Sequence, residues 1–231
     1  MITIEHGETY GWEAAVRGMR NPKNSWNRSD SIFAEGHTEL GENDLELMRT
    51  LANAGPDHGK FLRMIGVSCD ITGPLYWWKE MDTYKVGTVA DSCSTMHKIA
   101  AKEFELSDFS NEHLSESREC KMYSPALYKF SPMDLLGLEI AILNLYRDRF
   151  IKAKDQPELS KEYWWQMIQL LPSSYNQKRT WTANYAVLRN IYRARKDHKL
   201  DEWHTFCDWI ELLPYSELIT GKEKKHGKTE E

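Results

Sequence analysis

Residues 171–203 read LPSSYNQKRTWTANYAVLRNIYRARKDHKLDEW, and this stretch decides how the chain is interpreted. It places Asn184, Asn190 and Arg195 inside an otherwise apolar segment, at spacings that helix packing does not require. Amide and guanidinium groups are donors that hold nucleobases and phosphates. The segment therefore predicts a ligand pocket built from the last third of the chain.

Outward from this stretch, the pattern of apolar residues predicts a mixture of helices and strands. Alternation with period two predicts strands over 2–5, 65–71 and 179–182. Helical spacing and end signals predict helices over 11–20, 43–54, 131–153, 160–171, 185–195 and 201–213, with an aromatic helix or turn over 74–81. Residues 24–36 and 107–128 have no clean period and are expected to be loops. The fold class is therefore α+β.

Polar residues mark where three of these helices are expected to begin. Asn43 or Asp44 is expected to cap the second predicted helix, and Ser160 the helix over 160–171. Ser131 is followed by Pro132 and Asp134, a capping-box arrangement with proline at the first helical position. It predicts the start of the longest helix.

Length and charge bound the class of protein. The chain has 231 residues, 41% of them hydrophobic, and a formal net charge of −5, which suits an ordinary globular protein. We expect one domain over 1–220, followed by a charged, disordered tail over 221–231. The acidic balance argues against a DNA or RNA partner.

The cysteines and the apolar runs indicate in which cellular compartment the protein is expected. The four cysteines are scattered without a C-x-x-C pair, which favours reduced thiols and argues against a disulfide framework or a metal site. The first residues lack the features of a secretion signal, and no apolar run is long enough to span a bilayer. We therefore expect a soluble, cytoplasmic protein with no metal and no membrane partner.

The order and spacing within residues 171–203 resemble the C-terminal segment of the flavin-dependent thymidylate synthases. That family carries Leu-Pro, then Trp-Thr-x-Asn, Ser-Leu, Asn, and Arg-x-Asp before a Trp. Here Leu171 to Arg195 fits without a gap, and the link from Asp197 to Trp203 is one residue longer. The order of predicted elements fits over nearly the whole domain. The resemblance implies the fold of that family, a homotetramer, and pockets between subunits that bind FAD and deoxyuridine monophosphate.

The signature motif of the family is altered in this chain. It begins Arg-His-Arg and continues with Ser, Asn-Glu, Ser and Arg-Tyr. In the same register the chain has, in order, Thr83-Tyr84-Lys85, Thr88, Ala90-Asp91, Cys93 and Thr95-Met96. The arginines that align with Thr83 and Thr95 are lost, and one charge-assisted contact to a phosphate is worth about 1.5–3 kcal/mol. The resemblance thus predicts a retained pocket with changed ligand chemistry.

The resemblance also implies which residues form the site. The residues expected at the nucleotide are Arg195, Lys85, Asp91, Ser92 and Ser94. The residues expected at the cofactor, FAD, are Asn184, Asn190, His58 and His198. It assigns no catalytic residue.

Each of these assignments has a structural alternative. Asn184 and Asn190 also suit a helix cap and a surface amide, and His58 suits a loop. Arg195 lies among Arg189, Arg193 and other basic residues, a pattern that fits either a solvated helix face or a stripe that binds anions.

Two functions remain open, and with them the question whether the protein is an enzyme. The first is a diverged nucleotide-binding protein without standard synthase activity, which captures or sequesters a nucleotide. The alternative is an active flavin-dependent methyltransferase that converts dUMP to dTMP or acts on a related pyrimidine nucleotide. A scaffold without a ligand leaves the polar residues of the C-terminal segment unexplained. The surplus of Trp and Tyr favours a homo-oligomer, and the resemblance implies that it is a tetramer.

Overall fold

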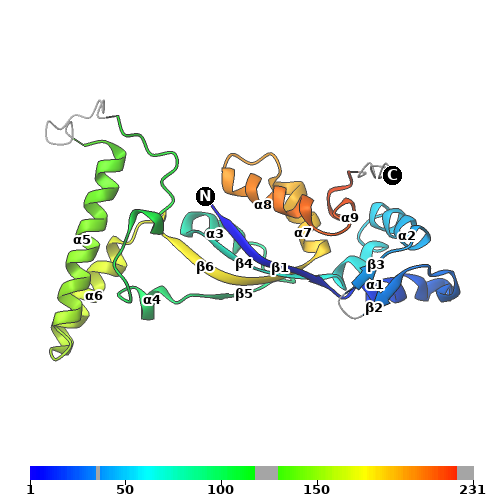
Figure 1. Ribbon diagram of the computed structural model, residues 1–231, viewed down its shortest axis with the longest axis horizontal. Helices are drawn as coiled ribbons and strands as arrows, with labels where there is room; N and C mark the ends of the chain where they lie inside the picture. Colours follow the sequence, from blue (N-terminus) through cyan, green and yellow to red (C-terminus); the bar gives the residue numbers. More distant parts are fainter. Residues whose placement is uncertain (35–36, 118–129, 223–231) are drawn as a thin grey trace. The chain divides into compact units, whose positions relative to one another are not determined.

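The computed structural model describes residues 1–34, 37–117 and 130–222, and Figure 1 gives the labels of its helices and strands. Contacts divide the chain into two compact units, each built from segments that are distant in sequence. Unit 1 comprises Met1, Thr72–Met81 and Ser92–Arg179, and unit 2 comprises Ile2–Ile71, Asp82–Asp91 and Thr180–Glu231. The expected tail lies outside the described residues from 223 onward, as does Cys120.

Four strands form a sheet in the order β1-β4-β6-β5. Their bounds are β1 (Thr3–Tyr10), β4 (Gly66–Pro74), β5 (Val89–Ser92) and β6 (Asn176–Asn184). In β4 the alternation predicted from the sequence is confirmed, because Val67, Cys69 and Ile71 are buried between less buried residues. β1 and β6 are longer than predicted. Most of β1 is exposed, so its sequence lacks the apolar alternation by which a strand is recognised.

Unit 2 contains most of the helices. They are α1 (Trp12–Arg20), α2 (Glu42–Asn53), α7 (Tyr185–Arg195), α8 (Asp201–Leu212) and α9 (Glu217–Thr220), with short 3-10 turns η1 (Asn21–Lys23), η2 (Trp26–Arg28) and η3 (Gly59–Arg63). α7 packs against η3, α8 and α9, and its bounds agree with the prediction. Tyr185, Trp203 and Phe206 are fully buried in this unit, so α7 and α8 each bring large aromatic side chains to its core.

The segment over 24–36, expected to be irregular, is partly ordered. Besides η2 it contains β2 (Ile32–Ala34), which pairs antiparallel with β3 (His37–Glu39). The expectation of a loop was wrong for these residues. The strands β2 and β3 could not be foreseen, because each is three residues long and so short a strand shows no alternating pattern in the sequence.

Asp44 does not cap α2, which corrects the prediction. The helix begins at Glu42, and Asp44 lies inside it, fully buried. Its carboxylate accepts hydrogen bonds from Arg20 Nε at 2.6 Å and from the Ser29 and Ser31 hydroxyls at 2.7 Å. The cap comes instead from Asp30, whose carboxylate accepts from the backbone N–H groups of residues 43 and 44 at 2.9 and 3.1 Å. A capping residue twelve positions before the helix gives no local signal in the sequence.

Unit 1 is built around a pair of helices. Its elements are α3 (Leu75–Met81), α4 (Thr95–Lys98), η4 (Leu106–Asp108), α5 (Pro132–Lys152) and α6 (Pro157–Leu170). α5 and α6 lie side by side (Figure 1). The predicted capping box is confirmed: Ser131 Oγ accepts from the N–H of Asp134 at 3.0 Å, and the Asp134 carboxylate accepts from the N–H of Ser131 at 2.9 Å.

The predicted start of the next helix was wrong. α6 begins at Pro157, with Gln156 at its N-cap, so Ser160 lies inside the helix. Proline suits the first helical position because its fixed backbone angle is already helical and its missing N–H would have no partner there. The proline signal therefore prevailed over the serine signal.

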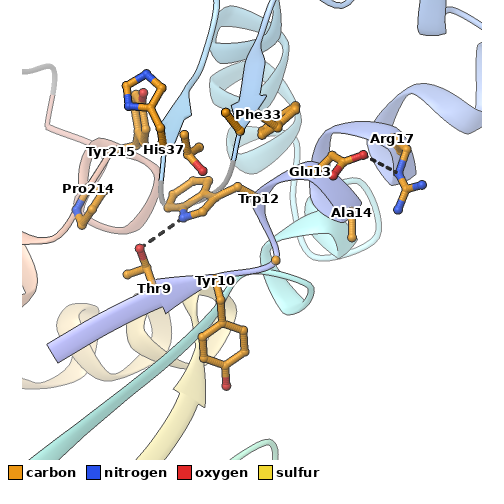
Figure 2. Close-up of a pocket in the computed structure, with 13 residues that line it drawn as sticks. Thr9, Tyr10, Trp12, Glu13, Ala14, Arg17, Phe33, His37, Pro214 and Tyr215 are labelled. Atoms are coloured by element: carbon orange, nitrogen blue, oxygen red, sulfur yellow. Dashed lines mark hydrogen bonds and ion pairs between the residues drawn. The ribbon is translucent and has the colours of Figure 1, made fainter. Parts of the chain in front are cut away.

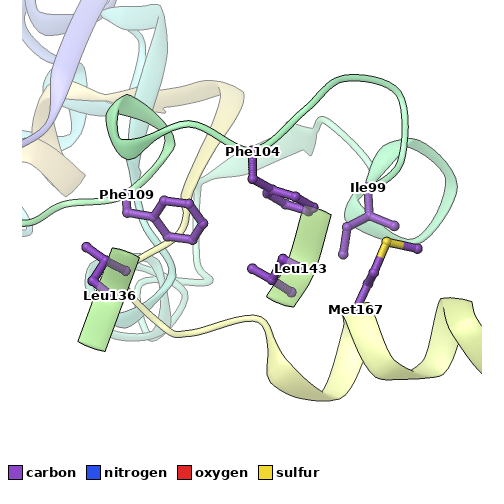
Figure 3. Packing of buried hydrophobic residues seen from close by; sticks show 6 residues of the cluster. All are labelled: Ile99, Phe104, Phe109, Leu136, Leu143 and Met167. Atoms are coloured by element: carbon purple, nitrogen blue, oxygen red, sulfur yellow. The ribbon is translucent and has the colours of Figure 1, made fainter. Parts of the chain in front are cut away.

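The core of unit 1 is a cluster of buried apolar residues (Figure 3). Its members are Ile99, Phe104, Phe109, Leu136, Leu143 and Met167. Asn144 of α5 ties the connecting segment to the helix, because its side-chain amide donates to the carbonyl of Phe104 at 2.9 Å and accepts from the N–H of the same residue at 2.8 Å.

Within the described residues, no helix has the length and apolar character needed to cross a bilayer. Within residues 1–34, 37–117 and 130–222, no three His, Cys, Asp or Glu side chains lie close enough to share a metal ion.

Candidate functional site

Arg195 lies at the end of α7, half-buried against two aromatic rings. Its Nε donates a hydrogen bond to the Tyr84 hydroxyl at 2.8 Å. Its guanidinium carbon is 4.7 Å from the centre of the Trp203 ring and 5.6 Å from that of the Tyr84 ring. Cation–π contacts of this kind contribute about 0.5–2 kcal/mol. Arg195 is therefore held in a fixed orientation, unlike a side chain on a freely solvated helix face.

His198 extends this cluster. Its ring lies 6.3 Å from that of Trp203, and its Nδ1 accepts from the N–H of Leu200 at 3.2 Å. Among the residues expected at a cofactor, His198 lies beside Trp203, the ring that also contacts Arg195.

Within unit 2, the first residues of the altered signature segment lie along α7. Near the C-terminal end of α7, Tyr84 contacts Arg195. Near the N-terminal end of α7, Gly87 has a φ of +78°, and a Cβ there would stand 3.2 Å from both Asn184 Nδ2 and Val187 Cγ2. The turn between them is closed by the Thr88 hydroxyl, which donates to the carbonyl of Tyr84 at 2.5 Å. Glycine is favoured at 87 by both its backbone angle and this close approach.

Asn184 caps a helix, which is the structural alternative to a role at the cofactor. It is the N-cap of α7, and its side-chain oxygen accepts from the N–H of Val187 at 3.1 Å. Its Nδ2 faces the signature segment near Gly87. Asn190 is exposed on the same helix, and His58 is exposed at the N-cap of η3.

The remaining residues expected at the nucleotide are mostly exposed. Lys85 and Asp91 in unit 2, and Ser92 in unit 1, are open to solvent. Ser94 is half-buried and caps α4, where its hydroxyl accepts from the N–H of His97 at 3.3 Å. Of this set, Arg195 contacts the signature segment from outside it, through its hydrogen bond to Tyr84.

Arg189 is excluded from a stripe that binds anions. It is buried, and its guanidinium donates to the carbonyl of Leu218 at 2.8 Å and to the Asn53 side chain at 3.0 Å. Burial, with a smaller contribution from the charge of Arg193, lowers the pKa of Arg189. Its role is to join α7 to α9 and α2.

The role of Tyr84 was not predicted from the sequence. Tyr84 stands at the position of the signature histidine, and in the structure its hydroxyl accepts a hydrogen bond from Arg195. The available signal was the aromatic character of Tyr84 itself, since the face of an aromatic ring and its hydroxyl suit contact with a guanidinium.

A cavity of about 660 Å³ lies elsewhere in unit 2. It is bounded by the start of α1, by β2 and β3, and by Pro214 and Tyr215 (Figure 2). Trp12 is buried beneath it; its indole N–H donates to the Thr9 hydroxyl at 3.1 Å, and its ring meets those of Tyr185 and Tyr215 edge to face. Neither this cavity nor a smaller one of about 90 Å³ beside α9 is lined by any residue that the resemblance assigned to a site.

The residues expected at FAD differ in their surroundings within the single chain. The side-chain oxygen of Asn184 is engaged in the cap of α7, and Asn190 and His58 are exposed. None of the four lines either of the two cavities of about 660 and 90 Å³.

Comparison with solved structures gives the fold. The chain is similar to thymidylate synthase X from Helicobacter pylori, solved with FAD and dUMP, at 17% identity and a TM-score of 0.62, over 95% of this chain and 97% of that one. It is also similar to the UMP/dUMP methylase PolB from Streptomyces cacaoi, solved with 5-Br dUMP, at 14% identity and a TM-score of 0.60, over 96% and 95% of the chains. The same methylase bound with 5-Br UMP matches with a TM-score of 0.57.

No protein-family model matches the chain, and no curated sequence matches it. The mixed α+β fold is nonetheless that of the flavin-dependent thymidylate synthases, as the resemblance predicted. At these identities the likeness establishes the fold.

Proposed function

We propose that this protein binds a pyrimidine nucleotide at Arg195, assisted by Lys85, Asp91, Ser92 and Ser94. The observation that carries the proposal is the Arg195 cluster, in which a guanidinium is oriented by Tyr84 and Trp203. A preorganised arginine binds an anionic or carbonyl-bearing ligand without first losing the freedom of its side chain. Nucleotides occupy the similar structures, as dUMP in one protein and 5-Br dUMP or 5-Br UMP in another.

The nucleotide is proposed to be captured and not converted by standard thymidylate synthesis. Two arginines of the family signature are replaced by Thr83 and Thr95. At the position of the signature histidine, the Tyr84 hydroxyl engages the Nε of Arg195. Lys85 offers a point charge where the family has an arginine fork. Loss of such positioning groups affects rate strongly, since a misplacement of about 1 Å can lower it about a hundredfold.

The proposal includes assembly as a homo-oligomer, with a tetramer as the favoured form. Residues assigned to the cofactor are exposed or dispersed in the single chain, so a shared pocket for them requires a second copy. If FAD binds, it binds there, with Asn184, Asn190, His58 and His198 contributed by more than one chain. Bound flavin would supply hydride-transfer chemistry, and the residues named here would hold and orient it.

A flavin-dependent methyltransferase is the second candidate. Its support is the likeness in fold over at least 95% of this chain to a synthase and to a UMP/dUMP methylase. The absorbance spectrum of the purified protein separates the two candidates, because an oxidised flavin is yellow and a nucleotide alone is colourless.

The test of the nucleotide site is calorimetric titration with dUMP and UMP. Arg195→Ala is expected to weaken binding by about 1.5–3 kcal/mol, the usual worth of a hydrogen bond to a charged group. Arg193→Ala is the matched control, since it removes an exposed arginine from the same helix. Equal affinities for the two variants and the wild type, with both variants folded, would remove Arg195 from the site.

A further inference from the structure

The cavity of about 660 Å³ in unit 2 is not used by the proposed nucleotide site. Its volume lies within the range of about 300–1,000 Å³ that is typical of binding sites for small molecules. Three segments of unit 2 form its walls: residues 9–14 with Arg17, residues 33, 34, 37 and 38 of the hairpin, and Pro214 with Tyr215. The cavity is therefore large enough to hold a second, different ligand.

Aromatic side chains give the cavity its apolar surface. Trp12 is 5% exposed, and the rings of Tyr185 and Tyr215 hold it edge to face at centre-to-centre distances of 5.2 and 5.3 Å. Figure 2 shows Phe33 and His37, from the two strands of the hairpin, on either side of the Trp12 ring in this view. Flat ring systems gain from contact with such surfaces, both by burial of apolar area and by ring geometry. The walls therefore favour an aromatic ligand.

The backbone of the walls is held in place by unusual conformations. Gly11 has a φ of +84°, and a Cβ there would stand 2.2 Å from the carbonyl oxygen of Met64. Tyr215 has a φ of +50°, and its hydroxyl accepts a hydrogen bond from the N–H of Leu40 at 2.9 Å. A left-handed conformation costs free energy in a residue other than glycine, and residues of this kind cluster at ligand sites. The cavity is thus bounded by residues that their contacts hold in position.

The charges on the lining indicate the polar group of the ligand. Arg17 and His37 are basic and Glu13 is acidic. Arg17 Nε lies 3.9 Å from Glu13 Oε1, and the two side chains are 67% and 60% exposed, so this pair is loose and open to a third group. One arginine suits a carboxylate, which it can bind with two parallel hydrogen bonds. A doubly charged phosphate would be repelled more strongly by Glu13.

We propose that this cavity binds a small aromatic carboxylic acid, whose ring lies against Trp12 and Phe33 and whose carboxylate pairs with Arg17. An aromatic amine would bring a positive charge to Arg17 and His37, so the acid is favoured over the amine. The inference goes beyond the proposed function, since Arg195 does not line the cavity.

The first experiment is calorimetric titration of the full chain with 1-naphthylacetate and with 1-naphthylmethylamine. The two probes share a ring system and carry opposite charges. The acid is expected to bind about tenfold more tightly than the amine, as a charge-assisted contact to one arginine implies. Equal binding of both probes, or tighter binding of the amine, would overturn the assignment of a carboxylate.

The second experiment removes the charge of the cavity. Arg17→Gln is expected to weaken binding of 1-naphthylacetate about tenfold and to leave binding of 1-naphthylmethylamine no weaker. Arg28→Gln is the matched control, because Arg28 is an exposed arginine of the same unit that does not line the cavity. Equal affinities for the acid in the wild type and both variants would remove Arg17 from the site and overturn the inference.

The third experiment fills the cavity. Ala14 is exposed on α1 and lines the cavity, so Ala14→Trp is expected to abolish binding of 1-naphthylacetate. Glu46→Trp adds the same ring at an exposed position of α2 outside the lining and is expected to keep the wild-type affinity. Circular dichroism checks that both variants are folded. Undiminished binding in a folded Ala14→Trp variant would place the acid elsewhere, and if this variant does not fold, Arg17→Gln decides.

The outcomes separate this inference from the proposed function. Arg195→Ala is expected to weaken binding of dUMP and to leave binding of 1-naphthylacetate unchanged. Loss of the acid in Arg195→Ala would place it at the nucleotide site and overturn the inference. A wild type that does not bind 1-naphthylacetate at millimolar concentration would also overturn it, while titration with dUMP would still decide the nucleotide site.

Discussion

Asp44 shows how one residue orders a segment without a regular pattern. Its buried carboxylate faces Arg20 and two serine hydroxyls, and it also accepts from the backbone N–H groups of residues 30 and 31 at 3.2 and 3.1 Å. The side chains of Asp44 and Arg20 are 0% and 4% exposed. A buried charge that is satisfied in this way fixes the path of the chain that supplies its partners.

We therefore expect Asp44→Asn to lower the free energy of unfolding by about 3–5 kcal/mol, because it leaves the charge of Arg20 buried and uncompensated. Chemical denaturation monitored by circular dichroism measures this. Glu46→Gln, on the exposed side of the same helix, is the matched control and should change stability by less than about 0.5 kcal/mol. A small effect at Asp44 would mean that water reaches the ion pair.

The same carboxylate makes stability depend on pH. Burial alone would raise the pKa of Asp44, but hydrogen bonds from Ser29, Ser31 and Arg20, with the charge of Arg20, outweigh it and lower that pKa below its ordinary 3.8. A lowered pKa in the folded state contributes stability that is complete above the unfolded value and is lost as pH falls through the folded one. Unfolding free energies measured from neutral pH downward should thus fall more steeply in acid for the wild type than for Asp44→Asn.

At the scale of elements, two serines were both predicted to cap helices, and only one of them does so in the structure. Ser131 caps α5 through its hydroxyl, so Ser131→Ala should destabilise the protein by about 0.5–2 kcal/mol. Ser160 lies inside α6, where alanine is the better helix former, so Ser160→Ala should be neutral or stabilising by a few tenths of a kcal/mol. Denaturation midpoints of the two variants measure the difference. Equal losses would place a cap at Ser160 after all.

Elements with strong local signals were predictable from the sequence. The bounds of α7 and the capping box of α5 follow from spacing and from residues within four positions of each other. The hairpin of β2 and β3 was not predictable, because strands this short show no period. The cap from Asp30 was not predictable either, because a capping residue distant in sequence leaves no local pattern. Individual contacts in the candidate site depend on tertiary structure in the same way. The sequence pointed to Arg195, but its pairing with Tyr84 joins residues 111 positions apart.

At the scale of the whole molecule, the fold of the thymidylate synthases is present while the signature that positions their ligands is altered. We expect that the gene does not rescue a bacterial strain that requires thymidine, and that the purified protein is colourless. The physical reason is the loss of positioning charges at Thr83 and Thr95, since rate depends steeply on the placement of reacting groups. Rescue together with a yellow preparation would show that other arginines, such as Arg63 or Arg179, compensate.

The described cysteines differ in exposure, and this difference allows one of them to be labelled with a fluorescent dye. Burial, with a smaller effect of Asp70, raises the pKa of Cys69 to about 12, and burial raises that of Cys207 to about 11 with help from nearby acidic residues. Cys93 is exposed, and thiolates are the species that react with maleimide dyes. In a Cys120→Ser chain, a dye should attach at Cys93, between Ser92 and Ser94. If a nucleotide binds at the proposed site, the emission of this dye should report its arrival in real time, without a turnover assay.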